Sequence, residues 1–138
     1  MKTAVIYWSG TGNTQAMAQC VCAGAKEVGA AAEAFSADEF SADKAAEYDS
    51  FAFGCPSMGD EELESAEFAP VFEACTDAIK GKKVALFGSY GWGDGQWMRD
   101  WEEDIEKKGA QLVGSVICCG EPDDDAQTQC KELGGKLG

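Results

Sequence analysis

The chain has 138 residues, of which 45% are hydrophobic and 26% are charged, and these proportions are typical of one globular domain. Its 25 acidic and 11 basic residues give a net charge of −14, which argues against nucleic acid as a partner, because phosphate backbones bind Lys and Arg. No apolar stretch approaches the roughly 20 residues of a membrane span. We therefore expect a cytoplasmic protein without membrane insertion. Its seven cysteines form no CxxC motif, and we expect them to be reduced thiols that bind no metal.

The first half of the chain alternates predicted strands and helices. Strands are predicted over 2–8, 30–35 and 50–54, and the alanine-rich second one is expected at an edge of the sheet. A helix is predicted over 12–28, where Lys26 and a following glycine suit a helix end. A turn with a short helical piece is predicted over 36–47.

The second half continues the alternation. Helices are predicted over 66–79, 96–108 and 126–137, and strands over 83–88 and 112–119. Five short apolar strands separated by helices predict a parallel sheet covered on both faces. With right-handed crossovers this is an α/β fold, a three-layer doubly wound five-stranded domain that spans 1–138. Its ligand is expected at the carboxyl ends of the strands.

The stretch SGTGNT follows the first predicted strand and opens the first helix. A glycine-rich turn at a helix start offers backbone N–H groups to an anion. The stretch lacks the lysine of a Walker A loop and the third glycine of a dinucleotide fingerprint. It therefore suits a terminal phosphomonoester bound by neutral donors. The candidate residues are Ser9, Gly10, Thr11, Gly12, Asn13 and Thr14.

Three motifs together resemble those of one known family. SGTGNT, CPSMGDEELE at 55–64 and GSYGWGDGQWMRDWEE at 88–103 are similar to the flavin loops of flavodoxins, most closely the short-chain clostridial type. The resemblance covers the whole chain in order and spacing. It implies a flavodoxin-like sheet of order 2-1-3-4-5 with FMN at the point where the strand order reverses, an arrangement for which flavodoxin is the standard example.

The resemblance also implies roles for residues around the flavin ring. Trp92 would cover the outer face and Met58 the inner face. A peptide flip at Met58-Gly59-Asp60 would stabilise the neutral semiquinone, and Gly59 allows the positive φ that one turn type needs. Glu61 would bind the N3–H edge. The remaining expected contacts are Pro56, Ser57, Ser89, Tyr90, Gly91 and Gly93, with Pro56 and Gly120 as departures from some relatives.

Acidic residues gather in the same loops. Segments 3–25, 56–79, 84–98 and 109–130 contain no Lys or Arg. The acids expected near the flavin are Asp60, Glu61, Glu62, Glu64, Asp94, Glu121, Asp123, Asp124 and Asp125. At about 10 Å and an effective dielectric of about 20, each would cost an anionic flavin roughly 1.7 kcal/mol before screening. This surface predicts a low potential and transient docking of redox proteins with basic patches.

The sequence thus predicts a monomeric electron carrier rather than an enzyme. It would carry single electrons on non-covalent FMN, cycling between semiquinone and hydroquinone, and could substitute for ferredoxin. An FMN-dependent NAD(P)H or quinone reductase is the main alternative, although a stacked Trp92 would leave it little room for a second substrate. A signalling receiver domain would need an acidic cluster after the first strand, where this chain has Ser9-Gly10-Thr11. A flavin-free interaction domain is a further alternative.

Overall fold

The computed structural model describes residues 2–10, 12–58, 63–91 and 95–137. The five strands are β1 (Lys2–Tyr7), β2 (Ala31–Ser36), β3 (Ser50–Gly54), β4 (Lys83–Tyr90) and β5 (Gln111–Cys119). All neighbouring strands are parallel, and their order is β2-β1-β3-β4-β5. The predicted fold class and strand order are therefore confirmed, and the alanine-rich β2 lies at an edge as expected.

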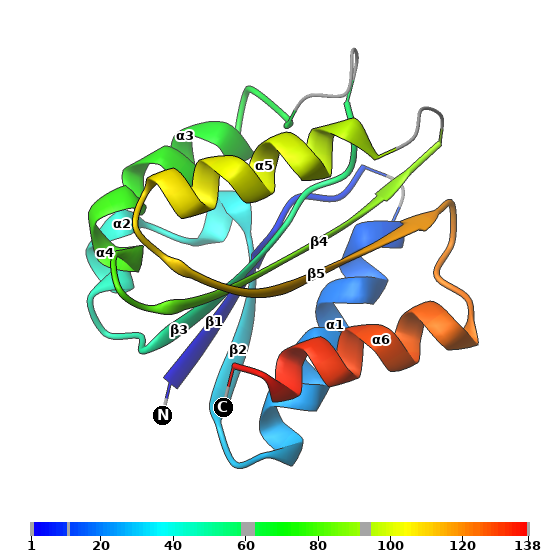
Figure 1. The fold of residues 1–138 in the computed structure, drawn as a ribbon, viewed down its shortest axis with the longest axis horizontal. Helices are drawn as coiled ribbons and strands as arrows, with labels where there is room; N and C mark the ends of the chain where they lie inside the picture. Colours follow the sequence, from blue (N-terminus) through cyan, green and yellow to red (C-terminus); the bar gives the residue numbers. More distant parts are fainter. Residues whose placement is uncertain (1, 11, 59–62, 92–94, 138) are drawn as a thin grey trace.

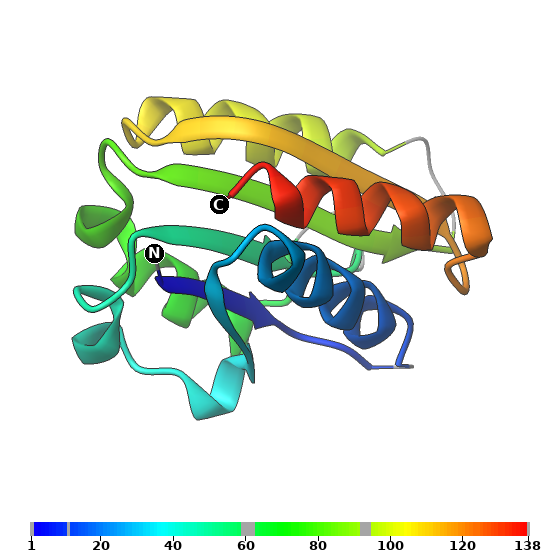
Figure 2. The same cartoon turned by 90° about the horizontal axis from the view of Figure 1, so that it is seen from below.

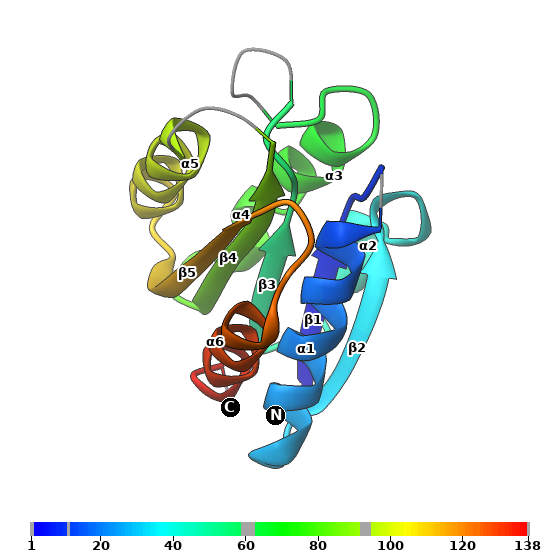
Figure 3. The same cartoon turned by 90° about the vertical axis from the view of Figure 1, so that its right-hand side faces the viewer.

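Helices cover both faces of the sheet. They are α1 (Asn13–Glu27), α2 (Ala42–Ala45), α3 (Phe68–Ala74), α4 (Thr76–Ile79), α5 (Gln96–Lys107) and α6 (Asp124–Gly135), with a 3₁₀ turn η1 (Ala37–Glu39) after β2. Figure 1 and Figure 3 show α1 and α6 on one face, and α3 and α5 on the other. The layers are those that the alternating sequence pattern predicts.

The two faces are packed with different kinds of side chain. The face under α3 and α5 is aromatic: Phe72 meets Phe53 edge-on at 5.0 Å and Trp101 at 5.7 Å between ring centroids. Such edge-to-face pairs are favourable beyond the area that they bury. The other face has Phe87 as its one fully buried aromatic ring within the described core and is otherwise aliphatic, with many small side chains such as Ala18 and Ala25 of α1.

Small residues let α1 and α6 approach backbone to backbone, and Figure 2 shows the two helices side by side. A Cβ atom on Gly134 would lie 2.9 Å from the backbone nitrogen of Ala25 and closer still to the carbonyl oxygen of Val21. On Gly24 it would meet the backbone of Lys131 at similarly forbidden distances. Only glycine fits at these two crossing points, so the helix pair depends on them.

Most element boundaries differ from the prediction by one or two residues; α6, for example, spans Asp124–Gly135 rather than 126–137. β4 runs to Tyr90 rather than residue 88, because its last two residues still pair with Cys118 and Cys119 of β5. β1 ends at Tyr7, which leaves Trp8 outside the strand. The predicted helix over 66–79 is two helices, α3 and α4, with Cys75 between them.

Candidate functional site

The carboxyl ends of the parallel strands meet at one end of the sheet, where Figure 3 shows the strand arrows pointing. A cavity of about 410 Å³ opens there. Its described lining comes from the segments after β1, β3 and β5 and from the end of β4 with the residue that follows it: Trp8, Gly10, Asn13, Pro56, Ser57, Met58, Ser89, Tyr90, Gly91 and Gly120. This volume lies within the range of small-molecule sites.

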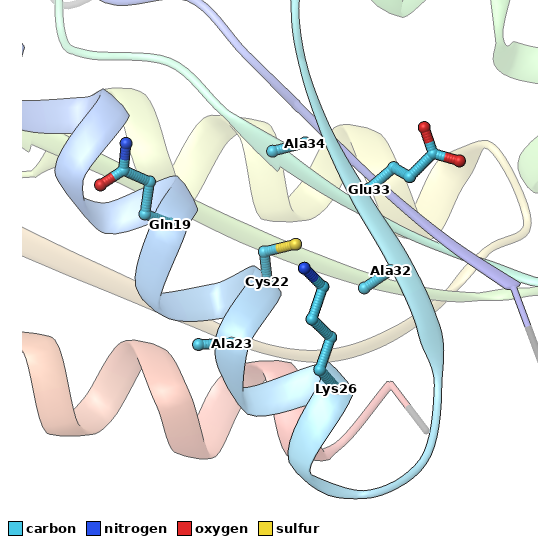
Figure 4. A pocket seen from close by; sticks show the side chains of 7 residues that line it. All are labelled: Gln19, Cys22, Ala23, Lys26, Ala32, Glu33 and Ala34. Carbon is cyan, nitrogen blue, oxygen red and sulfur yellow. The ribbon is translucent and has the colours of Figure 1, made fainter.

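A second, larger cavity of about 490 Å³ lies between α1 and β2. Figure 4 shows its lining of Gln19, Cys22, Ala23, Lys26, Ala32, Glu33 and Ala34. It contains no aromatic side chain and no glycine-rich turn, and none of the predicted site residues lines it. The cavity at the strand ends is therefore the better candidate, although it is smaller.

The first loop holds its glycine in the conformation that an anion site needs. Gly12 has φ 95° and ψ −9° and precedes the first residue of α1. Its own N–H donates to Ser9 Oγ at 3.0 Å. The first turn of α1 carries no acid, and no side chain of a described residue caps it. The first amides of this 15-residue helix can therefore donate to a bound anion. Thr11 lies outside the described residues.

Thr14 ties this loop to the end of β4. The residue is 1% exposed, and its Oγ1 lies 3.3 Å from Ser89 Oγ. The same oxygen accepts the backbone N–H of Ser89 at 3.4 Å. Thr14 is not among the residues that line the cavity. Its hydroxyl thus joins the loop after β1 to the end of β4 without lining the cavity itself.

Pro56, Ser57 and Met58 form a second wall of the cavity. The N–H of Ser57 donates to the carbonyl oxygen of Ser89 at 3.1 Å, which continues the parallel pairing of β3 and β4 past the strand end. The predicted contacts Gly59, Asp60 and Glu61 lie outside the described residues.

Tyr90 and Gly91 form the third wall. The Tyr90 ring packs against Trp97 of α5 with 5.6 Å between centroids, and its carbonyl oxygen accepts the N–H of Gly120 at 2.9 Å. Gly120, one of the two predicted departures from some relatives, thereby lies at the cavity. Trp92 and Gly93 lie outside the described residues.

Trp8 is a lining residue that the sequence analysis missed. Its indole Nε1 donates to Glu67 Oε1 at 3.3 Å, so it joins the first loop to the segment before α3. The missed signal is its position: the residue between a buried strand and a glycine-rich loop can face the ligand, whereas the strand pattern assigns it to the sheet.

Some of the acidic residues near the cavity stabilise the start of a helix as well as adding charge to the surface. Asp123 caps α6 by accepting the N–H of Ala126 at 2.8 Å, and Asp124 and Asp125 lie in the first turn of the same helix. The favourable interaction of acids with a helix N-terminus therefore explains part of this acidity. Glu121 is exposed. Asp60, Glu61, Glu62 and Asp94 lie outside the described residues.

Glu64 turns inward rather than toward a flavin edge. Its carboxylate accepts the backbone N–H groups of Ala66, Glu67 and Phe68 at 2.9, 2.7 and 2.8 Å. Burial alone would raise the pKa of Glu64, but these three bonds outweigh it and hold the pKa below its usual value. Glu64 is therefore a charged cap at the start of α3.

The described residues contain neither a disulfide nor a cluster of metal ligands. All seven cysteines are free thiols, and no group of His, Cys, Asp and Glu among the described residues could hold a metal ion. None of the helices in the described part of the chain is long and apolar enough to cross a membrane.

Comparisons with known proteins agree with this geometry. The flavodoxin family model matches residues 5–134. A flavodoxin of Megasphaera elsdenii is 45% identical over 130 residues, which cover 94% of this chain and 93% of that protein. A flavodoxin of Clostridium beijerinckii is 43% identical over 133 residues, which cover 96% of each.

Solved structures give the same result. The solution structure of two-electron reduced Megasphaera elsdenii flavodoxin has a TM-score of 0.90 and 44% identity, covering 98% of this chain and 97% of that one. The structure of a flavodoxin from the domain Archaea has a TM-score of 0.88 and 26% identity, covering 99% of this chain and 96% of that one.

Proposed function

The chain belongs to the flavodoxin family of FMN-binding electron carriers, and from this premise we propose that the cavity at the strand ends is its FMN site. Two observations support the fit. One end of the cavity is a helix start with amides free to bind an anion, and the other has the apolar side chains of Trp8, Pro56, Met58 and Tyr90. A flat ring system with a phosphate tail needs both.

The helix start at Gly12 carries the proposal. In our assignment the phosphate binds the segment made of Ser9, Gly10, Thr11, Gly12, Asn13 and Thr14. Gly12 has a left-handed φ, and Asn13, the first residue of α1, lines the cavity, so the helix start lies at the proposed phosphate position. Segment 3–25 contains no Lys or Arg, so the bound phosphate would keep its negative charge.

The ring would lie between the loops after β3 and β4. On the first side we assign Pro56, Ser57, Met58, Gly59, Asp60 and Glu61, and on the second side Ser89, Tyr90, Gly91, Trp92 and Gly93. The described members of both sets line the cavity, which supports the assignment. The others rest on the sequence resemblance.

Bound FMN supplies the redox chemistry, because flavin exchanges electrons one at a time as well as in pairs. The chain binds and orients the ring between two loops and keeps its surroundings anionic. Negative charge beside the ring opposes further reduction, and about 1.4 kcal/mol of such repulsion corresponds to ~59 mV for one electron. We therefore propose a low-potential carrier that can replace ferredoxin.

The same charge defines the partners. With a net charge of −14, the protein would attract redox proteins that carry basic patches, through small and transient contacts. We propose that it acts as a monomer in the cytoplasm.

A matched pair of glycine variants tests the phosphate assignment. Gly12 and Gly29 lie just outside opposite ends of α1, with φ of 95° and 94°, and a Cβ on either would meet no other atom within 4 Å. Each substitution by alanine should therefore cost a similar backbone strain of about 1 kcal/mol.

Only Gly12→Ala should weaken FMN binding, by about tenfold or more, as measured by quenching of flavin fluorescence in the apoprotein. Gly29→Ala should bind FMN as the wild type does. Riboflavin, which lacks the phosphate, should discriminate little between the two variants. An equal loss of FMN affinity in both would contradict the assignment, and failure of the wild type to bind FMN would contradict the site itself.

A further inference from the structure

The backbone N–H, the carbonyl oxygen and the sulfur of Cys55, the residue after β3, all make hydrogen bonds. Its N–H donates to the carbonyl oxygen of Phe87 at 3.1 Å, and its own carbonyl oxygen accepts Nε1 of Trp97 at 3.2 Å. The side chain is completely buried. Its sulfur accepts the backbone N–H of Glu64 at 3.3 Å. Cys55 is thus a fixed point between β4 and α5.

Glu64 is fixed from the other side. Its carboxylate binds the backbone of the first residues of α3, and its carbonyl oxygen accepts the N–H of Ala69 at 2.9 Å. The contact between the Cys55 thiol and the Glu64 amide therefore joins two anchored ends. In the sequence, eight residues lie between Cys55 and Glu64.

Resting on the proposed FMN site, we propose that the hydrogen bond from the Glu64 amide to the Cys55 sulfur is a clasp that positions Pro56, Ser57 and Met58 for the flavin ring. Cys55 is then a positioning residue rather than a residue that touches the cofactor. Met58, three positions along the chain from the clasp, lines the cavity, and Cys55 itself does not. A loop whose ends are already joined loses less conformational entropy when a ligand orders it.

The thiol suits this role because it stays neutral. Burial is the main reason that the pKa of Cys55 is raised to about 12. The sulfur can therefore accept the Glu64 N–H while its own S–H is directed to the carbonyl oxygen of Pro56 at 3.5 Å. The first bond holds the end of the loop at Glu64, and the second holds its first residue, Pro56.

Cys75 provides a matched control. It is also completely buried and belongs to the same core cluster, but its sulfur makes no hydrogen bond within the described chain. Cys55→Ala and Cys75→Ala remove the same atom from the same core. Both should lower the stability of the apoprotein, and only Cys55→Ala should affect the cofactor.

We expect Cys55→Ala to weaken binding of FMN and of riboflavin by the same factor, about tenfold, because the clasp acts on the ring loop and not on the phosphate loop. Cys75→Ala should leave both affinities unchanged. Cys55→Ser, which keeps an acceptor on a shorter side chain, should fall between the wild type and Cys55→Ala. An unchanged riboflavin affinity in Cys55→Ala, or an equal loss in Cys75→Ala, would overturn the proposal.

A double-mutant cycle with Met58→Ala tests whether Cys55 affects flavin binding through the position of Met58. If the clasp positions the loop that carries Met58, then Cys55→Ala should cost much less than tenfold in the Met58→Ala background. A full further tenfold loss would show that Cys55 acts elsewhere, and would overturn the proposal.

Hydrogen exchange of the apoprotein separates this proposal from the proposed function. The Glu64 amide should be protected in the wild type and in Cys75→Ala, and should exchange at least tenfold faster in Cys55→Ala. An unprotected Glu64 amide in the wild type refutes the clasp even if FMN binds. A protected amide in a wild type that binds no FMN refutes the site instead.

Discussion

Replacing Gly134 by alanine tests the contact between α1 and α6. The new Cβ would overlap the carbonyl oxygen of Val21 and lie 2.9 Å from the Ala25 nitrogen, whereas ordinary contact begins at 3.4 Å, so the helices must move apart by clearly more than about half an ångström. Overpacking of this kind costs about 1–3 kcal/mol. Alanine recovers up to about 1 kcal/mol through its higher helix propensity. We therefore expect a net loss of about 1–2 kcal/mol.

The neighbouring Gly135 is the control for this prediction. A Cβ on Gly135 would lie 3.7 Å from Cγ1 of Val28, which is ordinary contact, so Gly135→Ala gains helix propensity without a clash. It should stabilise the protein by up to about 1 kcal/mol. The same chemical change at two adjacent positions should thus have opposite signs.

Urea unfolding of the apoprotein, followed by circular dichroism, measures both effects. The apoprotein is the right form, because a bound ligand would add its own binding free energy to the stability. The expected loss for Gly134→Ala corresponds to a fall in Tm of roughly 3–10 °C for a domain of this size. If both variants lose stability equally, or Gly134→Ala loses none, the close helix contact does not exist as described.

Three further outcomes follow from the contacts of single side chains. Thr14→Val keeps the shape but leaves the amide and hydroxyl of Ser89 without their partner, so urea unfolding should show a loss of about 1–3 kcal/mol. The exposed Cys119 should react with a thiol reagent at pH 8 before Cys55, whose pKa of about 12 keeps it protonated, and mass spectrometry of labelled peptides would show the reverse order if this is wrong. The lowered pKa of Glu64 stabilises the fold fully above its usual value of 4.5, and this contribution is lost as the pH falls through the lower folded value. Glu64→Gln should therefore weaken the dependence of stability on pH below 4.5, and an unchanged acid-unfolding curve would count against the buried cap.

The strands and their order were the most predictable part of the fold. Buried parallel strands are continuous apolar runs, and the Lys83–Gly88 stretch shows this clearly. The strand order came from the family resemblance and is confirmed. The break at Cys75 was not predictable, because residues 71–79 contain neither glycine nor proline and Pro70 lies in the first turn of α3. There the N–H of Cys75 bonds back to Phe72 at 3.1 Å, and the hydroxyl of Thr76 bonds to the carbonyl oxygen of Glu73 at 2.7 Å.

In the site, the sequence indicated which loops meet but not how each side chain is used. Thr14 was predicted as an anion donor, and the structure shows its hydroxyl shared with Ser89. Glu64 was counted with the surface acids, and it is a buried cap. Spacing along a loop does not reveal whether a carboxylate turns to solvent or to a helix start. The direction of that turn depends on tertiary neighbours, as it does for Trp8 and Glu67.

The Asp123 carboxylate that caps α6 also affects the surface charge of the protein. Asp123 starts the helix and also contributes to the negative field at this end of the molecule, so charge and local order are tied together at that position. Asparagine caps a helix as well as aspartate does, and therefore the two roles can be separated one residue at a time without loss of the helix. The surface charge of this carrier can thus drift during evolution toward a new partner while the fold stays the same.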